Sequence, residues 1–379
     1  MSLLRRAAIL KATTLAMLLL SFSSGLHAEG EPLQFEILPP LPEPVTNNAV
    51  ALLPDGQGFQ LYSALGLEAG KTEGDTSSKA FHYSSHTGYW KRLQPVPGPA
   101  GRLAASAVVV AGQAYVFGGY SVARDGSEES TSSVYRLQRE TGQWQLFTDM
   151  PVPVEDAVVL AYQDRYVYLV SGWHDLGNVN LVQVLDTSNG QWSQATPYPG
   201  APVFGHSGGI AGDRFIICDG VRIEYPGDDS PRQFLPAREC WQGKIAADNY
   251  RRIDWRPVGA HPGQPRYRMA AGGNDQDRVF FAGGAANPYN FNGIGYDGVP
   301  SRPEDEVFSY DFEATAWQCH GSLPVATMDH RGLPWRDGWF YIIGGMRNAQ
   351  RVSAEVFRFK PAPAQTCRAG TQRISAPDP

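Results

Sequence analysis

The residues best suited to chemistry are arginines and proton-transferring side chains that lie beside the ends of apolar segments. The arginines are Arg102, Arg222, Arg268 and Arg331, and the groups that could move protons are Glu155, Asp219, His206 and Glu224. Arginine can hold a substrate carboxylate through paired N–H donors, and a carboxyl or imidazole within hydrogen-bond reach can act as a general acid or base. We predict Arg222, Asp219 and Glu155 as catalytic residues, and Arg102, His206, Arg268 and Arg331 as substrate-binding residues.

Aromatic side chains accompany these groups. Trp173 and Tyr267 lie beside apolar segments, and Tyr289 belongs to a stretch rich in Asn and Tyr over residues 287–297. Aromatic and amide side chains with few charges suit stacking against a sugar and hydrogen bonding to it. Taken singly, each position fits an ordinary surface residue. Taken together they indicate a ligand site, so we add Trp173, Tyr267 and Tyr289 to the predicted binding residues.

Other chemistries lack their residues in this sequence. The histidines show no pair with metal-ligand spacing along one strand, so we predict no metal site and no cofactor. No phosphate-binding loop and no nucleophile motif is present. The net charge of −6 and the pI near 5.8 give no basic surface, so nucleic acid is not an expected partner.

A repeated unit must position these residues. Five apolar strands end in glycine at intervals of roughly fifty to sixty residues, and a tryptophan keeps the same phase. The strand ends lie at Gly119, Gly172, Gly220, Gly284 and Gly345, with a fainter copy at Gly66, and the tryptophans are Trp90, Trp144, Trp192, Trp255 and Trp317. A fixed period built from strand signals indicates a radial or linear array. The 41 glycines and 29 prolines are typical of short strands joined by tight turns.

Each unit divides into four strands, which predicts an all-β, six-bladed β-propeller over residues 29–379. The blades are expected at about 47–101, 102–156, 157–202, 203–266, 267–330 and 331–360, followed by a C-terminal tail over 361–379. The last blade supplies only three strands, whereas segment 32–42 resembles the end of a unit. The N-terminal strand Leu33 to Leu38 is therefore predicted to complete the last blade and close the ring, which protects the sheet edges.

The first 28 residues differ from the repeats. Arg5, Arg6 and Lys11 precede a short apolar run over residues 12–20, which is typical of a cleavable signal peptide with cleavage after Ala28. The run is too short to span a bilayer, and no second apolar segment of this kind follows. We expect no membrane insertion after cleavage and a periplasmic or secreted location.

Export would place the cysteines in an oxidising compartment, where disulfides form. The four are Cys218, Cys240, Cys319 and Cys367, and no two have the Cys-x-x-Cys spacing of redox or zinc motifs. The sequence alone allows three pairings. We favour Cys218 with Cys240, on neighbouring strands of the fourth blade, and Cys319 with Cys367, which would pin the C-terminal tail.

The two faces of such a propeller should differ. Four antiparallel strands place the tight turns between strands one and two, and three and four, on one face. The longer loops between strands two and three, and the links between blades, lie on the other. Binding residues concentrate on variable loops held by a rigid scaffold, so this long-loop face is the expected site. We predict that Arg222, Arg268 and Arg331 point into one pocket there.

The repeats resemble kelch repeats in their paired glycines and in the turn Thr141-Gly142-Gln143-Trp144. Among secreted six-bladed kelch proteins, the chain resembles the bacterial periplasmic N-acetylneuraminate mutarotase (epimerase) family, most clearly at 280–285 and 330–345. The resemblance implies an isomerase of carbohydrate metabolism that interconverts the anomers of sialic acid, with an arginine cluster and an acid/base pair. The arginine of the family after strand two of the fourth blade corresponds to Arg222, whereas Val221 occupies the position of its glutamate.

Two other hypotheses stay open. The chain could be a non-catalytic propeller that binds a glycan or a protein partner, for which exposed aromatic residues suffice. A galactose-oxidase-like enzyme is less favoured, because it needs an additional blade and a metal-bound Tyr/Cys arrangement. For the first two hypotheses the expected ligand is a small sugar acid or a glycan, and the enzymatic one requires a buried carboxyl beside the arginines.

Overall fold

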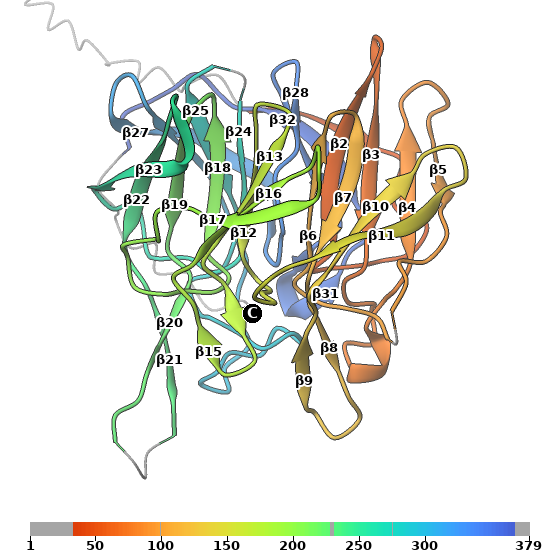
Figure 1. Ribbon diagram of the computed structural model, residues 1–379, viewed down its shortest axis with the longest axis horizontal. Coiled ribbons are helices and arrows are strands. Elements are labelled where there is room, and N and C mark those ends of the chain that lie inside the picture. Colours follow the sequence, from red (N-terminus) through yellow and green to blue (C-terminus); the bar gives the residue numbers. More distant parts are fainter. Residues whose placement is uncertain (1–32, 99, 228–230, 275, 368–379) are drawn as a thin grey trace, which may run out of the picture. The chain divides into compact units, whose positions relative to one another are not determined.

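Six four-stranded antiparallel sheets form the body of the chain in the computed structural model (Figure 1). The structure describes residues 33–98, 100–227, 231–274 and 276–367, which lie in one compact unit. The first strands of successive sheets contact one another, and those of the sixth and first sheets also meet. The fifth and sixth are joined by Leu333 N–H, which donates to Ala271 O at 2.9 Å. The predicted six-bladed all-β propeller is therefore confirmed.

The strands keep chain order within each blade. Blades one and two consist of β2 (Ala49–Asp55), β3 (Gly58–Ala64), β4 (Ala80–Ser84), β5 (Tyr89–Arg92), β6 (Ser106–Val110), β7 (Gln113–Phe117), β10 (Ser133–Gln138) and β11 (Gln143–Asp149). Blades three and four consist of β12 (Val158–Tyr162), β13 (Tyr166–Val170), β16 (Val182–Asp186), β17 (Gln191–Gln194), β18 (Ser207–Ala211), β19 (Arg214–Cys218), β22 (Cys240–Ala246) and β23 (Asn249–Val258). Blade five consists of β24 (Ala270–Gly273), β25 (Arg278–Ala282), β26 (Glu304–Asp311) and β27 (Ala316–Thr327). Blade six consists of β28 (Trp335–Arg336), β29 (Trp339–Ile343), β32 (Val356–Lys360) and β1 (Gln34–Leu38).

The N-terminal strand closes the ring. β1 pairs antiparallel with β32, with Gln34 opposite Lys360 and Leu38 opposite Val356. Arg358 of β32 adds an ion pair to Glu36 of β1 at 2.6 Å. The predicted closing strand is confirmed, so the first and last strands of the described chain belong to one sheet.

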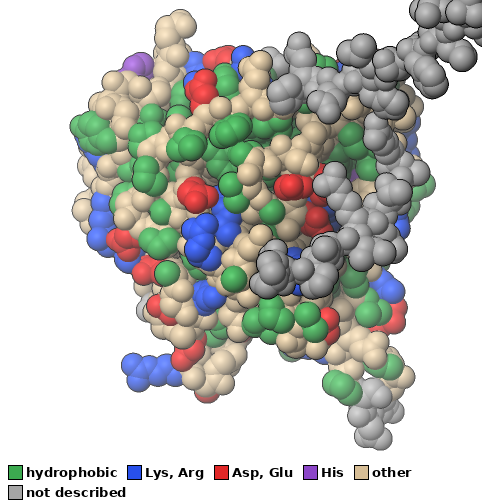
Figure 2. Space-filling view, turned by 180° about the vertical axis from the view of Figure 1, so that it is seen from behind, with side chains coloured by type: hydrophobic (Ala, Val, Ile, Leu, Met, Phe, Trp, Pro, Cys, Tyr) green, Lys and Arg blue, Asp and Glu red, His purple; other side chains and the backbone are tan. Residues whose placement is uncertain are grey.

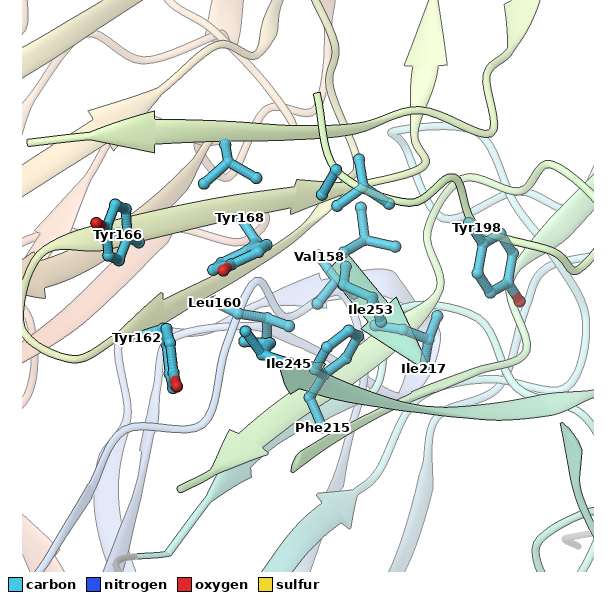
Figure 3. Packing of buried hydrophobic residues seen from close by; sticks show 14 of the residues in the cluster. Val158, Leu160, Tyr162, Tyr166, Tyr168, Tyr198, Phe215, Ile217, Ile245 and Ile253 are labelled. Carbon is cyan, nitrogen blue, oxygen red and sulfur yellow. The ribbon is translucent and has the colours of Figure 1, made fainter. Parts of the chain in front are cut away.

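Apolar side chains fill the spaces between neighbouring blades. Between the third and fourth blades, Val158, Leu160 and Tyr168 face Phe215 and Ile217 (Figure 3). The second strands have a neighbouring blade on both sides, so β13 is buried at every position and reads as a continuous apolar run. The tryptophans of the repeats take part in this packing, as Trp255 shows: its ring meets Phe215 edge-on with centroids 5.1 Å apart.

Both predicted disulfides are present. Cys218 and Cys240 lie opposite each other in the pairing of β19 with β22 and are bonded. Cys319 of β27 is bonded to Cys367, the last described residue. The second bridge fixes the segment after β32 against the outer strand of the fifth blade.

Short hairpins extend from one face of the propeller. They are formed by β8 (Tyr120–Val122) with β9 (Glu128–Ser130), β14 (Trp173–His174) with β15 (Gly177–Asn178), β20 (Val221–Glu224) with β21 (Gln233–Pro236), and β30 (Met346–Arg347) with β31 (Arg351–Val352). All follow second strands, so they belong to the long-loop face, at the bottom of Figure 1. The 3-10 turns η1 (Glu73–Asp75) and η2 (Asn348–Gln350) are the described helical elements, and neither has the length or hydrophobicity of a membrane-crossing helix. The predicted signal peptide lies outside the described residues.

The surface seen in Figure 2 mixes charges. Lys and Arg side chains lie near Asp and Glu side chains over the described part of this face. The visible part of this face carries no broad area of one sign.

Candidate functional site

One residue with a left-handed backbone precedes the first strand of every blade. These residues are Asn47, Ala104, Asp156, Gly205, Arg268 and Asp329, with φ between 54° and 69°. The residue before each of them bridges to a residue beyond the second strand of the same blade, as Glu155 does to Trp173 and Tyr267 to Ala285. Each segment that links two blades is therefore held against the blade it enters, immediately before the segment turns toward the axis.

Hydrogen bonds join these six positions around the axis. Asp156 N–H donates to Ala104 O at 3.0 Å, Gly205 N–H to Asp156 O at 3.0 Å, and Arg268 N–H to Gly205 O at 2.8 Å. His330 N–H continues the series to Arg268 O, Asn47 N–H donates to Asp329 O at 3.1 Å, and Ala104 N–H donates to the Asn47 side chain. At position 205 a Cβ atom would lie 1.9 Å from the Tyr267 ring, so the close approach of that ring requires glycine.

Four charged side chains fill the centre of this ring, and we call them the axial network: Asp156, Arg268, Asp329 and Arg331. Arg268 donates from Nε to Asp156 at 3.1 Å and from an Nη atom to Asp329 at 3.0 Å. Arg331 contacts the other oxygen of Asp156. Asn47 donates to Asp329 at 2.7 Å. Two arginines thus face two aspartates, and the buried charges balance.

A pocket of about 280 Å³ lies on the long-loop side of this network, and we call it the loop-face pocket. Its lining is Tyr120, Gly126, Glu128, Glu155, Asp156, Trp173, Phe204, Arg232, Phe234, Arg268, Asn290, Phe291 and Tyr296. Phe234 and Tyr296 stack with centroids 4.0 Å apart, and Trp173 meets Phe204 edge-on. The pocket therefore offers aromatic walls of the kind that bind the apolar faces of sugars.

Glu155 is a buried carboxyl in the lining of this pocket. Its residue is 4% exposed, and it accepts a hydrogen bond from the Ser130 hydroxyl of β9. Burial raises the pKa of Glu155 to about 8, helped by the nearby charges of Glu128 and Asp175. Glu155 is therefore a neutral acid at pH 7 and can donate a proton. Burial also raises the pKa of Glu128, while Arg268 and Arg232 oppose that shift.

Two arginines face the loop-face pocket, and they differ in whether carboxylates compensate their charge. Arg268 is compensated by both aspartates of the axial network and lies over the Tyr267 ring at 4.6 Å. Arg232 lies over Trp173 at 5.1 Å and over Phe234 at 5.2 Å. Within the described ranges Arg232 has no carboxylate within 4.0 Å, so its positive charge is available to an anionic ligand.

The structure brings some predicted site residues to the pocket. Glu155, Trp173 and Arg268 line it directly. Tyr267 and Tyr289 are buried beside Arg268, with their rings edge-on and 4.9 Å apart. They therefore shape the wall behind the pocket.

Other predicted residues lie elsewhere. Asp219 is buried, with its carboxylate bound by His261 and by Arg266 N–H at 2.7 Å. Arg102 is buried and donates to Gly118 O at 3.0 Å, and burial lowers its pKa to about 10. Neither lines the loop-face pocket.

The predicted convergence of three arginines in one pocket is wrong. Arg222 lies on the projecting hairpin β20–β21, partly exposed, and pairs with Glu224 of the same strand. Arg331 and His206 line a cavity on the other side of the axial network. Arg268 alone of the three lines the loop-face pocket. Arg268 and Arg331 belong to links before first strands, whereas Arg222 belongs to a hairpin beyond a second strand.

Sequence reasoning missed several pocket residues, namely Glu128, Phe204, Arg232 and Phe234. Three of them lie on or beside the hairpins β8–β9 and β20–β21, which follow second strands on the long-loop face. The length of the 221–238 insertion is a signal for such a hairpin, although it does not give the direction of the side chains. Among the described residues, no group of three or more His, Cys, Asp or Glu could hold a metal ion.

Comparisons with known proteins agree with this architecture. A kelch motif model matches residues 101–151. The chain is 23% identical over 262 residues to Kelch-like protein 15 of Danio rerio, which covers 65% of this chain and 39% of that protein. It is 24% identical over 311 residues to N-acetylneuraminate epimerase 1 of Escherichia coli O6:H1, which covers 71% of this chain and 79% of that protein. The solved structure of YjhT has a TM-score of 0.67 at 16% identity and covers 87% of this chain and 99% of that one.

Proposed function

Because the chain is a kelch-type six-bladed β-propeller, we propose that its loop-face pocket binds a sialic-acid-type sugar acid and interconverts its anomers. One observation carries the proposal. A buried neutral carboxyl, a cation without a carboxylate partner in the described part of the chain, and stacked aromatic rings share a single pocket, through Glu155, Arg232 and Phe234 with Tyr296. The similarity to a protein named N-acetylneuraminate epimerase supports the choice of sugar acid.

The substrate would be bound by an arginine, which pairs with its carboxylate, and by aromatic rings, which stack on its sugar ring. Arg232 would hold the substrate carboxylate through two N–H donors, with its own planar group supported by Trp173 and Phe234. The aromatic walls would cover the apolar face of the sugar ring. Arg268 would contribute little additional attraction, because Asp156 and Asp329 already compensate it.

The chemistry is a ring opening followed by its reversal. Glu155 would donate its proton to the ring oxygen as the bond between that oxygen and the anomeric carbon breaks. Glu128 would take the proton of the anomeric hydroxyl, which leaves an open-chain ketone. Rotation about the bond next to the carbonyl and the reverse transfers then give the other anomer, with no net gain or loss of protons. Carboxyls with different environments are suited to such opposite roles.

We place this activity outside the cytoplasm. The two disulfides fit an oxidising compartment, and residues 1–28 have the pattern of a signal peptide. The substrate would then be met after its release from glycans in the periplasm or outside the cell.

The test is the rate of anomeric equilibration of freshly released N-acetylneuraminate, followed by NMR with and without the protein. We expect acceleration by the native protein, loss of acceleration in Glu155→Gln with binding retained, and loss of binding in Arg232→Ala. Binding without acceleration in the native protein would favour the non-catalytic glycan-binding propeller. Absence of binding to sialic acid would exclude the proposed substrate class.

A further inference from the structure

A second cavity lies on the opposite side of the axial network. It has a volume of about 240 Å³ and is lined by residues from the first strands or preceding links of all six blades. It extends from Arg331 and His206, next to the network, to Ala161 and Trp335, nearer the tight turns. We call it the axial channel. It shares no lining residue with the loop-face pocket.

Arg331 closes the inner end of this channel. It belongs to the link before the sixth blade and contacts Asp156, which precedes the third. Because the blades follow one another around the ring, the third and sixth are opposite, and the side chain must reach across the axis. The Arg331 side chain is 4% exposed.

Half of the Arg331 guanidinium has no partner. One Nη atom contacts Asp156, whereas Nε and the other Nη have no hydrogen-bond acceptor among the described residues. The nearest further carboxylate oxygen, from Asp329, lies 3.8 Å from that second Nη. Buried N–H donors without acceptors are costly, so this edge of the guanidinium is suited to a ligand.

The rest of the channel lining carries no compensating charge. No Asp or Glu is present among the described lining residues, and burial lowers the pKa of His206 to about 4 and that of His330 to about 3, which leaves both rings neutral at pH 7. The walls are small and mainly aliphatic: Val50, Val108, Val159, Gly208, Ala271 and Gly332. The channel thus has unpaired guanidinium donors of Arg331 at one end and mainly small aliphatic side chains along its walls.

We propose that the axial channel binds a short-chain aliphatic monocarboxylate. Its two oxygens accept hydrogen bonds from Nε and the free Nη of Arg331, an edge whose planar donors match a carboxylate. Its hydrocarbon tail lies along the aliphatic walls. This site is distinct from the loop-face pocket, with which it shares no lining residue.

The experiment is saturation-transfer NMR with butyrate on the full-length protein, with three variants. Arg331→Met removes the charge and keeps the length of the side chain. Gly332→Val narrows the channel and leaves Arg331 in place, because a Cβ at position 332 would meet Val50 at an ordinary 3.6 Å. Arg252→Met is the control, since Arg252 is an exposed surface residue paired with Asp248.

We expect a butyrate signal in the native protein and in Arg252→Met, a signal lost in Gly332→Val, and an affinity weakened roughly tenfold or more in Arg331→Met. If Arg331→Met does not fold, the butyrate signal of Gly332→Val alone tests the proposal. No signal in the native protein, or an undiminished signal in Gly332→Val, overturns the proposal. Chloride that binds while butyrate does not would also overturn it, because the site would then select a halide.

Discussion

Two adjacent carboxylates, Glu155 and Asp156, show how one link between blades serves both sides of the axial network. Asp156 turns into the axis and pairs with Arg268 and Arg331, so its charge is fully used. Glu155 turns into the loop-face pocket, accepts a hydrogen bond from the Ser130 hydroxyl with no ion pair among the described residues, and is neutral at pH 7. Asp156, a buried acid paired with two arginines, stabilises the fold. Glu155 has no ionic partner in the described part of the chain and is available for proton transfer.

The largest effect should come from Asp156→Asn. Asparagine tolerates the left-handed backbone of this position, so the change removes charge and little else. Two buried arginines would lose their shared partner, and we expect the free energy of unfolding to fall by about 3 to 5 kcal/mol. Urea denaturation measures this.

Asp248→Asn is the control for that measurement, because its partner Arg252 is exposed and such pairs contribute about 0 to 1 kcal/mol. A loss of that small size in Asp156→Asn would show that the axial network contributes little to stability, and the contrast between the two carboxylates would disappear.

Glu155→Gln should change how stability depends on pH. The pKa of Glu155 is raised in the folded state to about 8, so between its unfolded value and that pH the folded protein holds a proton that the unfolded chain has released. The unfolding free energy of the native protein should therefore fall relative to Glu155→Gln as pH rises from about 4.5 to about 8, by up to about 1.4 kcal/mol per pH unit. If the unfolding free energies of the native protein and of Glu155→Gln changed in parallel with pH, Glu155 would not be neutral in the folded protein.

Arg232→Ala should separate binding from stability. Its side chain is exposed and lies over aromatic rings, so unfolding should change by less than about 1 kcal/mol. Loss of a charge-assisted hydrogen bond should weaken binding of a sugar acid by roughly tenfold to a hundredfold. Calorimetric titration with N-acetylneuraminate measures this affinity, and an unchanged affinity in Arg232→Ala would exclude Arg232 from the binding site.

Arg222→Ala should have the smallest effect. Its partner Glu224 lies on the same exposed strand, so both stability and sugar-acid affinity should change by less than about 1 kcal/mol. A larger loss of affinity than in Arg232→Ala would restore the role that the sequence comparison gave to Arg222, and would extend the site along the hairpin β20–β21.

Much of the fold was accessible to sequence reasoning because it rests on local patterns. Glycine at the ends of second strands, tryptophan after a turn and a three-strand last unit suffice to predict six blades and the closing strand β1. The pairing of Cys218 with Cys240 followed from their places on neighbouring strands, and the structure has it.

The site was less accessible, because it depends on where side chains point after a link or hairpin leaves the sheet. Glu155, Trp173 and Arg268 could be placed near the axis since they flank strands of known direction. Arg232 and Glu128 come from hairpins beyond second strands, and the sequence pattern does not give the direction of their side chains. Nor could the sequence show that Arg268 and Arg331 would both pair with Asp156, because those residues lie far apart in the chain.

The pairing of β1 with β32 has a consequence for how the molecule reaches its folded state. The two strands lie at opposite ends of the described chain, with Gln34 opposite Lys360, so this contact has among the largest sequence separations in the protein. Contacts of this kind form slowly, because the loop entropy is lost before the contact is gained. β1 therefore has no partner strand until β32 has been synthesised and folded into the sixth blade. Until then the sixth blade presents an open edge of β32, which a second copy of the chain could pair with.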